Sequence, residues 1–559
     1  MDREIVGAEK QAARQRKKGR RTHRVDNRGQ LRLLEWEGES EPQGREIPAG
    51  LEEVRRYVDP DPEGILFGNE GLRSYLEKRG EKRTIGLRKL LRGLKLEGLH
   101  KKPPGSGRPP YHPASMVGLI LLGLLEGKSS LRQLETLART DVRACWISGG
   151  IQPDHSVIGR FIQEHREELS EGFFVELTQQ VLQQSRSWGG DLAGDGTVIQ
   201  AAGSGYRKVK MEAAQQAARE AEEASRRNPK DARLKRRKEE ARKVAELVQQ
   251  RQKQRQQQYK PGEVSVSPSD PEAVIQPLKA PGGTAPSYKP VVLSNAQQMV
   301  VAQNVDASCE HAVYAELLEQ AGRSSGEVKR VRLDAAYFNF DVLRSSARRK
   351  IELLCPEGKT TDEGGQAKQT ERYHKSVFVY DEKQDCYHCP AGQRLVPLRR
   401  GQQGGRAYLR YGGAPCQDCI QREQCTNSGQ GRTLKRYEEE ALKDQLRARM
   451  KLPQAQQEYQ KRKSMVEPVF ARIKQHQGLR RFKRRGLANV RVEFALWAAA
   501  HNVARWWALQ PDGGLFQALF KMPYPFLSRV LRTLCYIPAN LLPFESRRPE
   551  RLILFNFLS

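Results

Sequence analysis

The sequence lacks a hydrophobic run long enough to cross a membrane. Its longest apolar stretch near the start, MVGLILLGLL at 116–125, reaches only half of the ~20 residues that a spanning helix needs. A later stretch, FALWAAAHNVARWWAL at 494–509, is interrupted by His501, Asn502 and Arg505, which predicts a buried helix instead. The N-terminus has no apolar core of a secretory signal. We therefore expect a soluble, intracellular protein with no membrane partner.

Acidic residues are scarce relative to basic ones. The chain has 67 Asp and Glu against 97 Lys and Arg, which gives a net charge of +30 and a pI near 9.8. A field of this sign attracts polyanions, and nucleic acid is the usual one. A ribosomal-type protein or a protein of a membrane surface would share this charge, so charge alone favours nucleic acid without deciding it. The chain is also too long for one simple core, and we expect roughly two to four folded units.

Cysteine is scarce as well, with nine residues, of which five lie within 386–425. This distribution does not match the disulfide framework of a secreted protein. Cys-x2-Cys spacing, brought near a second cluster across a loop, suits a tetrahedral structural zinc ion. The favoured ligand set, with Cys386 or His388 as alternates, is Cys389, Cys416, Cys419 and Cys425. Reduced cysteines without a metal are the alternative interpretation, because the spacing before the last cysteine is unusual for a zinc knuckle.

Composition and periodicity divide the rest of the chain into segments. Residues 1–83 are basic, and we expect them to be partly disordered. Residues 84–185 carry apolar residues three and four positions apart, which predicts an all-helical domain suited to DNA backbone contacts. Pro153 and Asp154 indicate the start of one of its helices. An ordinary helical domain of a basic protein is the alternative.

Residues 207–262 are almost uninterrupted helix formers with few large apolar side chains. Such a segment cannot bury a core of its own. It predicts a charged helical hairpin, broken near Asn228 and Pro229, that projects into solvent or lies on DNA or on a second subunit.

Strand-like runs lie on both sides of that hairpin. One run in 186–206 carries Asp195, and KPVVLSN with MVVAQNVD in 263–356 predicts a β-hairpin. Alternating helix and strand follow, with Asp334 at the end of one strand. This order predicts a multidomain α/β protein with a ribonuclease-H-like mixed sheet flanked by helices, to which an all-α N-terminal domain, a charged helical insertion and a Cys-rich insertion (357–450) are added.

Asp195 lies in an unusual stretch, GGDLAGDGTVIQAAGSGY at 189–206, where small residues surround a lone carboxylate. One interpretation is a turn, because Asp-Gly is the commonest two-residue hairpin connection. The other is a metal ligand that meets carboxylates from elsewhere in the chain. This stretch by itself does not decide between them.

Residues 451–510 carry the most informative motif. Tyr459, Glu467 and Lys474 fit the pattern Tyr-x2-Arg-x3-Glu-x6-Lys, including the six residues between the last two. The segment resembles the C-terminal catalytic signature of DDE transposases from bacterial insertion sequences. GDGTVIQAAGS resembles the first acidic motif of that family, and RLDAAYFN resembles the second. YHPASMVGLILLGLLEG with PDHSVIGRF is similar to the family's helical N-terminal domain, so the resemblance spans roughly residues 80–510.

The resemblance implies that Asp195, Asp334 and Glu467 are catalytic residues and ligands of two Mg²⁺ ions, for which Mn²⁺ substitutes. Two such ions lie about 3.5–4 Å apart, one activating a water or a 3′-hydroxyl and the other stabilising the leaving oxygen. Mg²⁺ keeps several waters, so a few carboxylates suffice as protein ligands. The two aspartates would be neighbours at the sheet centre, with Glu467 approaching from a helix. On this basis Asp195 is a ligand rather than a turn residue.

Arg462 departs from the family pattern, since four residues rather than three separate it from Glu467. Lys463 has the three-residue distance. On a continuous helix Lys463 and the other motif residues fall within roughly 80°, whereas Arg462 points about 140° away from Glu467. This geometry favours Lys463 as the phosphate-contacting residue. Pro468 can kink the helix or begin it, so the assignment stays open.

The resemblance also implies DNA contacts. Tyr459 and Lys474 would contact phosphates next to the cut, by a hydrogen bond and by charge. The run RRFKRRG at 480–486 predicts a DNA-backbone patch, with a solvated charge run as the alternative. Its basic residues are Arg480, Arg481, Lys483, Arg484 and Arg485. The apolar tail at 511–559 has no functional interpretation.

As a whole, the resemblance implies a transposase of the bacterial cytoplasm, associated with the nucleoid. It would bind the terminal inverted repeats of its own element, cut there and join the 3′-hydroxyl ends to target DNA. Because two double-stranded DNA ends must be joined together, a homodimer or higher oligomer is implied, with the helices of 207–259 as candidates for its interface. The alternatives are an inactive or domesticated DNA-binding protein and a non-transposing nuclease on the same fold.

Overall fold

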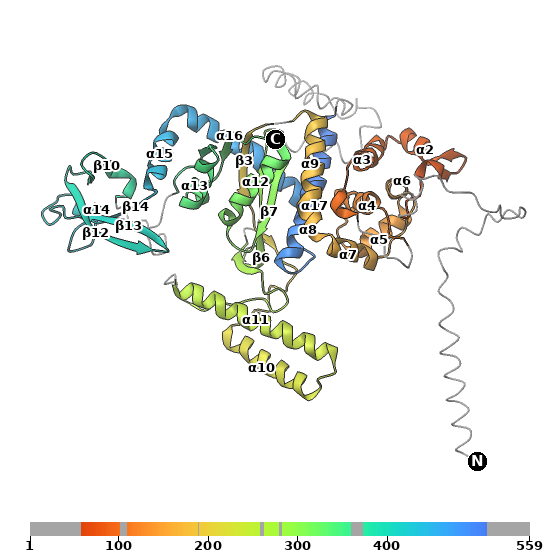
Figure 1. Cartoon of the computed structure of the whole chain (residues 1–559), viewed down its shortest axis with the longest axis horizontal. Helices are drawn as coiled ribbons and strands as arrows, with labels where there is room; N and C mark the ends of the chain where they lie inside the picture. Colours follow the sequence, from red (N-terminus) through yellow and green to blue (C-terminus); the bar gives the residue numbers. More distant parts are fainter. Residues whose placement is uncertain are drawn as a thin grey trace, which may run out of the picture. The chain divides into compact units, whose positions relative to one another are not determined.

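The computed structural model describes residues 57–100, 109–187, 189–257, 262–278, 282–358 and 373–510. The predictions for residues 1–56 and for the tail 511–559 lie outside the described residues. The described residues form a mixed helix-and-sheet protein with several sheets, consistent with a multidomain α/β architecture (Figure 1). Within this part of the chain, no helix is long and apolar enough to cross a membrane. The domain boundaries expected from the sequence stay predictions.

The described residues of 57–187 are mostly helical, because their apolar residues recur at helical spacing. The start of a helix at Asp154 is confirmed: its carboxylate accepts hydrogen bonds from the backbone N–H groups of Ser156 and Val157 at 2.8 and 2.9 Å. Ser130 caps another helix through a capping box. The α-helices are α2 (Leu72–Lys78), α3 (Lys82–Arg92), α4 (Pro113–Leu125), α5 (Leu131–Thr140), α6 (Val142–Ser148), α7 (His155–Glu164), α8 (Arg166–Ser170) and α9 (Gly172–Ser185). Two 3₁₀ turns, η2 (Pro62–Gly64) and η3 (Glu97–Leu99), and a short pair of strands, β1 (Leu66–Phe67) and β2 (Glu70–Gly71), accompany them.

The main sheet is mixed. Its strands are β3 (Asp191–Gly196), β4 (Ile199–Gln200), β5 (Val274–Pro277), β6 (Thr284–Ser294), β7 (Val300–Asp306), β8 (Arg330–Arg332) and β9 (Glu352–Leu354). They follow the order β4-β6-β3-β8-β9, and β5 and β7 also pair with β6. The predicted hairpin is confirmed as the antiparallel pair β6–β7, whereas β8 is parallel to both β3 and β9. The parallel connections contain α12 (Tyr314–Ser325) and α13 (Phe340–Arg348).

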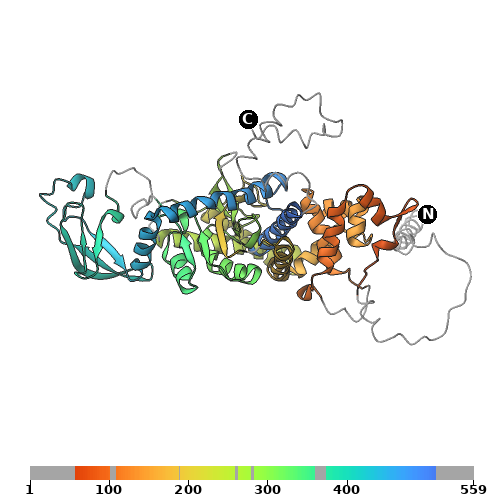
Figure 2. The ribbon, with the colours of Figure 1, turned by 90° about the horizontal axis from the view of Figure 1, so that it is seen from above.

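The predicted buried helix near residue 500 is confirmed as part of α17 (Leu487–Leu509). This helix contacts β7 of the sheet as well as α9, α8 and α4, and it shares one hydrophobic core with all of them (Figures 1 and 2). The buried Asn502 satisfies its amide inside this core, because its side chain donates to the Val300 carbonyl at 2.8 Å and accepts from the Val300 N–H at 2.8 Å. The sheet and the N-terminal helices are thereby joined through α17.

Helix α16 (Pro453–Ala471) lies against the sheet and carries the residues of the third motif. Pro468 lies inside the helix, which continues to Ala471 and ends in η7 (Arg472–His476), a π-type turn. The Arg332 side chain, 2% exposed, donates to the backbone carbonyl of Glu458 at 2.8 Å and to its carboxylate at 2.6 Å. This contact between a buried guanidinium and the partly exposed Glu458 holds α16 over β8.

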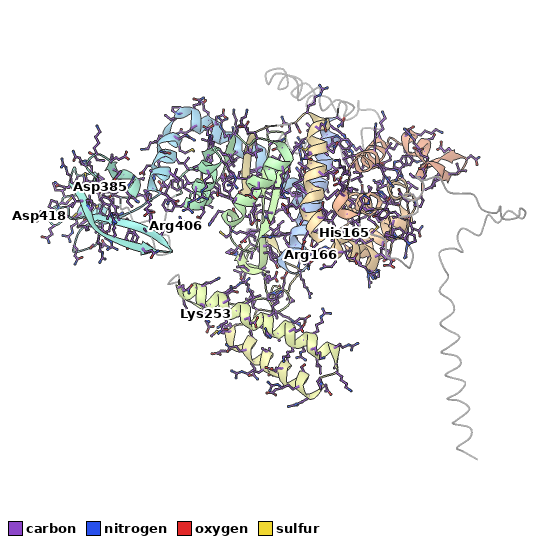
Figure 3. The ribbon with its side chains drawn as sticks, viewed as in Figure 1. His165, Arg166, Lys253, Asp385, Arg406 and Asp418 are labelled. Atoms are coloured by element: carbon purple, nitrogen blue, oxygen red, sulfur yellow. The ribbon has the colours of Figure 1, made fainter. Side chains whose placement is uncertain are left out.

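Two helices form a hairpin between β4 and β5: α10 (Met211–Arg227) and α11 (Ala232–Gln257), which carries Lys253 (Figure 3). Their own buried core is small and consists of Ala214, Val244 and Val248 with Val266. Ion pairs such as Lys238–Glu222 at 3.1 Å link the two helices on the outside. The hairpin therefore exposes most of its charged surface.

The cysteine-rich segment has a five-stranded antiparallel sheet with its own core. Its strands are β10 (Val379–Asp381), β11 (Cys386–His388), β12 (Arg394–Gln403), β13 (Arg406–Gly412) and β14 (Leu434–Tyr437), preceded by η6 (Lys375–Val377). A short helix, α14 (Arg422–Cys425), lies before β14, and α15 (Glu440–Lys451) leads to α16. Asp385 and Asp418 mark this segment in Figure 3. Its buried core is Phe378, Tyr387, Leu395, Tyr411 and Leu434.

Candidate metal centre

Two of the predicted acids meet at one edge of the main sheet. Ala193 of β3 lies opposite Arg332 of β8 in parallel register. Asp195 and Asp334 each follow two residues later, so the parallel pairing carries both side chains to the same edge. The strand β8 ends before Asp334, which instead caps the 3₁₀ turn η5 (Ala335–Tyr337) and accepts a hydrogen bond from the Ala336 N–H at 3.1 Å.

A third carboxylate, Glu310, joins them and was not predicted from the sequence. One oxygen of each of Asp195, Asp334 and Glu310 lies within 4.8 Å of the other two. Glu310 begins the 3₁₀ turn η4 (Glu310–Val313) in the connection from β7 to α12. The available signal was its position, an acid a few residues after a strand of the same sheet. Hard oxygen ligands in such a group are the donors that Mg²⁺ and Mn²⁺ prefer.

Glu467 does not belong to this group of three. It is an exposed residue of α16, whose buried positions are Ala455, Met465, Val466, Val469 and Phe470. The side of the helix that packs on the sheet is set by these apolar residues, and Glu467 lies beside that stripe. The role of Glu467 as third ligand therefore stays a prediction.

Arg462, and not Lys463, lies beside the aspartates. The Arg462 guanidinium is 3.6 Å from the Asp195 carboxylate and donates to the Gly194 carbonyl at 3.3 Å. Lys463 is exposed. The structure agrees with the helical-wheel geometry, since Arg462 points away from the exposed Glu467, and the buried apolar stripe turns Arg462 toward the aspartates. The phosphate-contacting role of Lys463 stays a prediction.

Burial and neighbouring charges shift the acidity of this centre. The pKa of Asp195 is raised to about 6, chiefly by burial and also by the nearby Asp334 and Glu310, against the opposing charge of Arg462. Burial also raises the pKa of Tyr459, which lies against Arg462. The pKa of Tyr337 is raised by burial first and then by the charges of all three acids. A cation between the carboxylates would relieve their mutual repulsion.

Two family models match the chain. A model described as a transposase DDE domain matches residues 388–507, and a model described as a transposase domain (DUF772) matches residues 81–164. Both matches support a DDE transposase of an insertion element. No curated protein matches the sequence. The first match includes α16 and the cysteine-rich strands from His388 on, whereas Asp195 and Asp334 lie before it.

Lys474 lies next to the first acidic motif. Its ammonium group donates to the Thr197 hydroxyl and to the Val198 carbonyl, the latter at 3.3 Å. Both acceptors follow the strand that carries Asp195. The last residue of the C-terminal motif is thus brought to the edge of the sheet where the aspartates meet, although its ammonium group has protein partners there.

The basic run 480–486 packs along β4. The Phe482 N–H donates to the Gln200 carbonyl at 2.9 Å, and the Arg481 guanidinium donates to the Ala201 carbonyl at 3.0 Å. Arg481 is therefore partly occupied by protein contacts. Arg480, Lys483 and Arg485 are exposed, and Arg484 is half-buried.

The buried Glu493 of α17 binds the backbone of this basic run. Its carboxylate accepts hydrogen bonds from the backbone N–H groups of Lys483, at 2.9 and 3.1 Å, and of Arg484, at 2.8 Å. Lys483, Arg484 and Glu493 line one cavity together with Arg132 and His155 of the N-terminal helices. The DNA patch expected from the sequence is therefore held in a fixed backbone conformation by a residue that the sequence did not single out.

The four favoured cysteines line one cavity: Cys389, Cys416, Cys419 and Cys425. The N–H of Gln393 donates to the Cys389 sulfur at 3.2 Å. The alternates, Cys386 and His388, lie on β11, where the His388 Nε2 is 3.8 Å from the Cys386 sulfur and 3.8 Å from Asp381.

The raised pKa of Glu493 predicts that the free energy of unfolding depends on pH. Burial raises its pKa from 4.5 to about 7, although the two backbone donors oppose this. A carboxyl group with a pKa raised by folding contributes stability that is complete below about pH 4.5 and is lost as the pH rises through about 7. The variant Glu493→Gln does not titrate. As the pH rises between these values, the free energy of unfolding of Glu493→Gln should therefore increase relative to that of wild type by at most about 3 kcal/mol.

Thermal unfolding of both proteins between pH 4 and pH 8 checks this prediction. Glu327→Gln, at an exposed position, is the control and should follow the wild-type curve. Parallel curves for wild type and Glu493→Gln would show that Glu493 has an ordinary pKa in the folded protein.

Proposed function

We propose that this transposase binds the terminal inverted repeats of its own element, cleaves phosphodiester bonds there and joins the freed 3′-hydroxyl ends to target DNA. The observation that carries the proposal is the meeting of Asp195 and Asp334 with a third carboxylate within 4.8 Å, in a chain matched by a transposase DDE domain. The parallel pairing of β3 with β8 in a mixed sheet, with α12 and α13 in the connections, supports a ribonuclease-H-like fold for the catalytic part.

The donor set of the centre fits Mg²⁺, with Mn²⁺ as a substitute. Carboxylate oxygens are hard ligands, and a few of them suffice for a cation that keeps several waters. Asp195 and Asp334 would hold the metal, with Glu467 as the third ligand of the family pattern. Two such ions supply an activated nucleophile and stabilise the leaving oxygen. The protein's part is to hold these ligands in place before DNA arrives.

The charged residues around the centre support a role in phosphate contacts. Arg462 lies 3.6 Å from Asp195, and Lys474 lies at the same edge of the sheet. We assign to them, with Tyr459, the contacts to the phosphates next to the cut. The exposed residues of the run 480–486 would bind the backbone further along the duplex, where the net charge of +30 attracts it. We propose that the protein works on the nucleoid in the bacterial cytoplasm.

Cleavage of a labelled duplex that carries the gene's own flanking ends tests the proposal. With Mg²⁺ or Mn²⁺, the wild-type protein should cut at the repeat boundary and, with target DNA added, join the ends to it. Asp195→Asn and Asp334→Asn should each lower the rate by at least about a thousandfold, because the charge that holds the metal is lost. Binding of the duplex should be retained.

The control for this experiment is Glu327→Gln, which removes an exposed acid outside the centre and should cut at the wild-type rate. Tight binding without any cut in wild type would instead support an inactive DNA-binding protein. Cuts that are never followed by strand transfer would support a non-transposing nuclease.

We further propose that the four cysteines hold a structural zinc ion. They line one cavity in a segment whose own hydrophobic core has five buried residues. A core of that size supplies little stability, and small segments commonly gain the rest from a metal or disulfides. Thiolates are the ligands of structural tetrahedral zinc.

Elemental analysis of the protein purified without chelator should find one zinc per chain. Cys419→Ser and Cys425→Ser should lose this zinc and unfold at a lower temperature, because each removes a soft ligand. Cys145→Ser, in α6 of the N-terminal helices, is the matched control and should keep it. A protein that takes up no zinc even when excess Zn²⁺ is supplied would rule out the site.

For the assembly, we propose a dimer or higher oligomer on DNA, with α10 and α11 contributing to its interface. Their charged surface is largely exposed, because the hairpin buries few apolar residues of its own. Sedimentation of the protein with two bound element ends should give the mass of at least two chains. Replacement of residues 211–257 by a short linker should lower this mass. A monomer that holds both ends would contradict the proposal.

A further inference from the structure

Glu310 reaches the acidic centre through a space that only glycine leaves open. Gly196 directly follows Asp195 on β3. A Cβ atom at Gly196 would lie 2.5 Å from the carboxyl carbon of Glu310 and 2.7 Å from its Oε2. Real Cβ contacts are not this short, so any larger residue would displace the Glu310 carboxylate. The glycine of the first acidic motif therefore forms a cradle for an acid from another element.

The loop that carries Glu310 is held by its own hydrogen bonds. The Asp306 carboxylate at the end of β7 accepts from the N–H groups of Ser308, at 2.8 Å, and Cys309, at 2.6 Å. The Oε1 atom of Glu310 lies 3.1 Å from the Lys289 ammonium group. Its other oxygen, Oε2, is the one that lies over Gly196. One oxygen is thus paired with a cation of the protein, and the other faces the strand of Asp195.

A buried hydroxyl at the same place gives an independent indication of a ligand. Tyr337 is completely buried, and its hydroxyl has no hydrogen-bond partner among the described residues. Among the charges that act on it are those of Glu310, Asp334 and Asp195. Buried hydroxyl groups in proteins are normally hydrogen-bonded, because an unpaired one is costly. An unpartnered buried hydroxyl on the turn that Asp334 caps fits a polar occupant such as a hydrated cation.

We propose that Glu310 is a ligand of the divalent cation held by Asp195 and Asp334. This inference rests on the metal site of the proposed function and extends it by one residue. Asp195 comes from β3, Asp334 follows β8, and Glu310 comes from the connection after β7, so three separate elements surround the site. The three carboxylates would bind the cation together. When no cation is bound, the positive charge of Lys289 offsets part of the repulsion between them.

The alternative to a ligand role is a purely structural one, in which Glu310 only forms its ion pair with Lys289. These two roles predict different effects on metal binding when Lys289 is replaced. If Glu310 only holds Lys289, removing either partner should have the same effect. If Glu310 is a ligand, Lys289→Met releases its carboxylate and removes a competing positive charge, so metal binding should stay as tight or become tighter.

Binding of Mn²⁺ to the full-length protein, followed by the paramagnetic resonance signal of free Mn²⁺, tests the proposal. Glu310→Gln should weaken the tightest class of Mn²⁺ binding at least tenfold, whereas Lys289→Met should not weaken it. Asp195→Asn and Asp334→Asn should weaken it as well. Glu327→Gln, an exposed acid outside the centre, is the control and should bind as wild type does. Circular dichroism of each variant establishes that it is folded.

The outcomes separate this inference from the proposed function. Unchanged Mn²⁺ affinity in Glu310→Gln, with weakened binding in Asp195→Asn, would overturn the role of Glu310 alone. Equal losses in Glu310→Gln and Lys289→Met would assign the residue to the ion pair. Unchanged affinity in all the carboxylate variants would remove the metal site itself. If Glu310→Gln does not fold, Glu310→Asp keeps the charge but withdraws the carboxylate by one methylene, and it should weaken binding to a similar degree.

Discussion

The parallel pairing of β3 with β8 is the constraint on which the centre depends. Ala193 lies opposite Arg332, and each strand or its continuation presents an aspartate two residues later. A slip of one residue in this register would turn the side chains of a strand to the other face of the sheet and separate the two acids. The register is maintained by burial, since Leu192 and Val331 beside it are completely buried. The position of the acidic centre thus follows from packing in the sheet.

The second constraint is the docking of α16 over that sheet. Arg332 is buried with 2% of its side chain exposed, and it binds both the backbone and the carboxylate of Glu458. A buried guanidinium is costly unless it is paired, so this contact specifies where the helix lies more than it adds stability. The apolar stripe of α16 then decides the rotation of the helix. That rotation, and not the spacing of the motif, brings Arg462 next to Asp195.

The remaining segments have small cores and depend on other forces. The hairpin α10–α11 buries few apolar residues and is held by ion pairs, each of which contributes about 0–1 kcal/mol at an exposed surface. The cysteine-rich sheet buries five residues and brings four thiols to one cavity. Segments of this kind gain stability from a partner or a metal, which is why their proposed roles are an interface and a zinc site.

The sequence by itself determined the helices and strands with strong periodicity, the helix start at Asp154, the hairpin β6–β7 and the two aspartates that meet. These follow from local patterns of apolar and capping residues, which a linear sequence records directly. Only the tertiary structure decided that Glu310 joins the centre, that Arg462 faces it, and that Glu493 anchors the basic run. Each of these depends on contacts between residues far apart in the chain, set by sheet register, by the rotation of a packed helix and by the space that a glycine leaves.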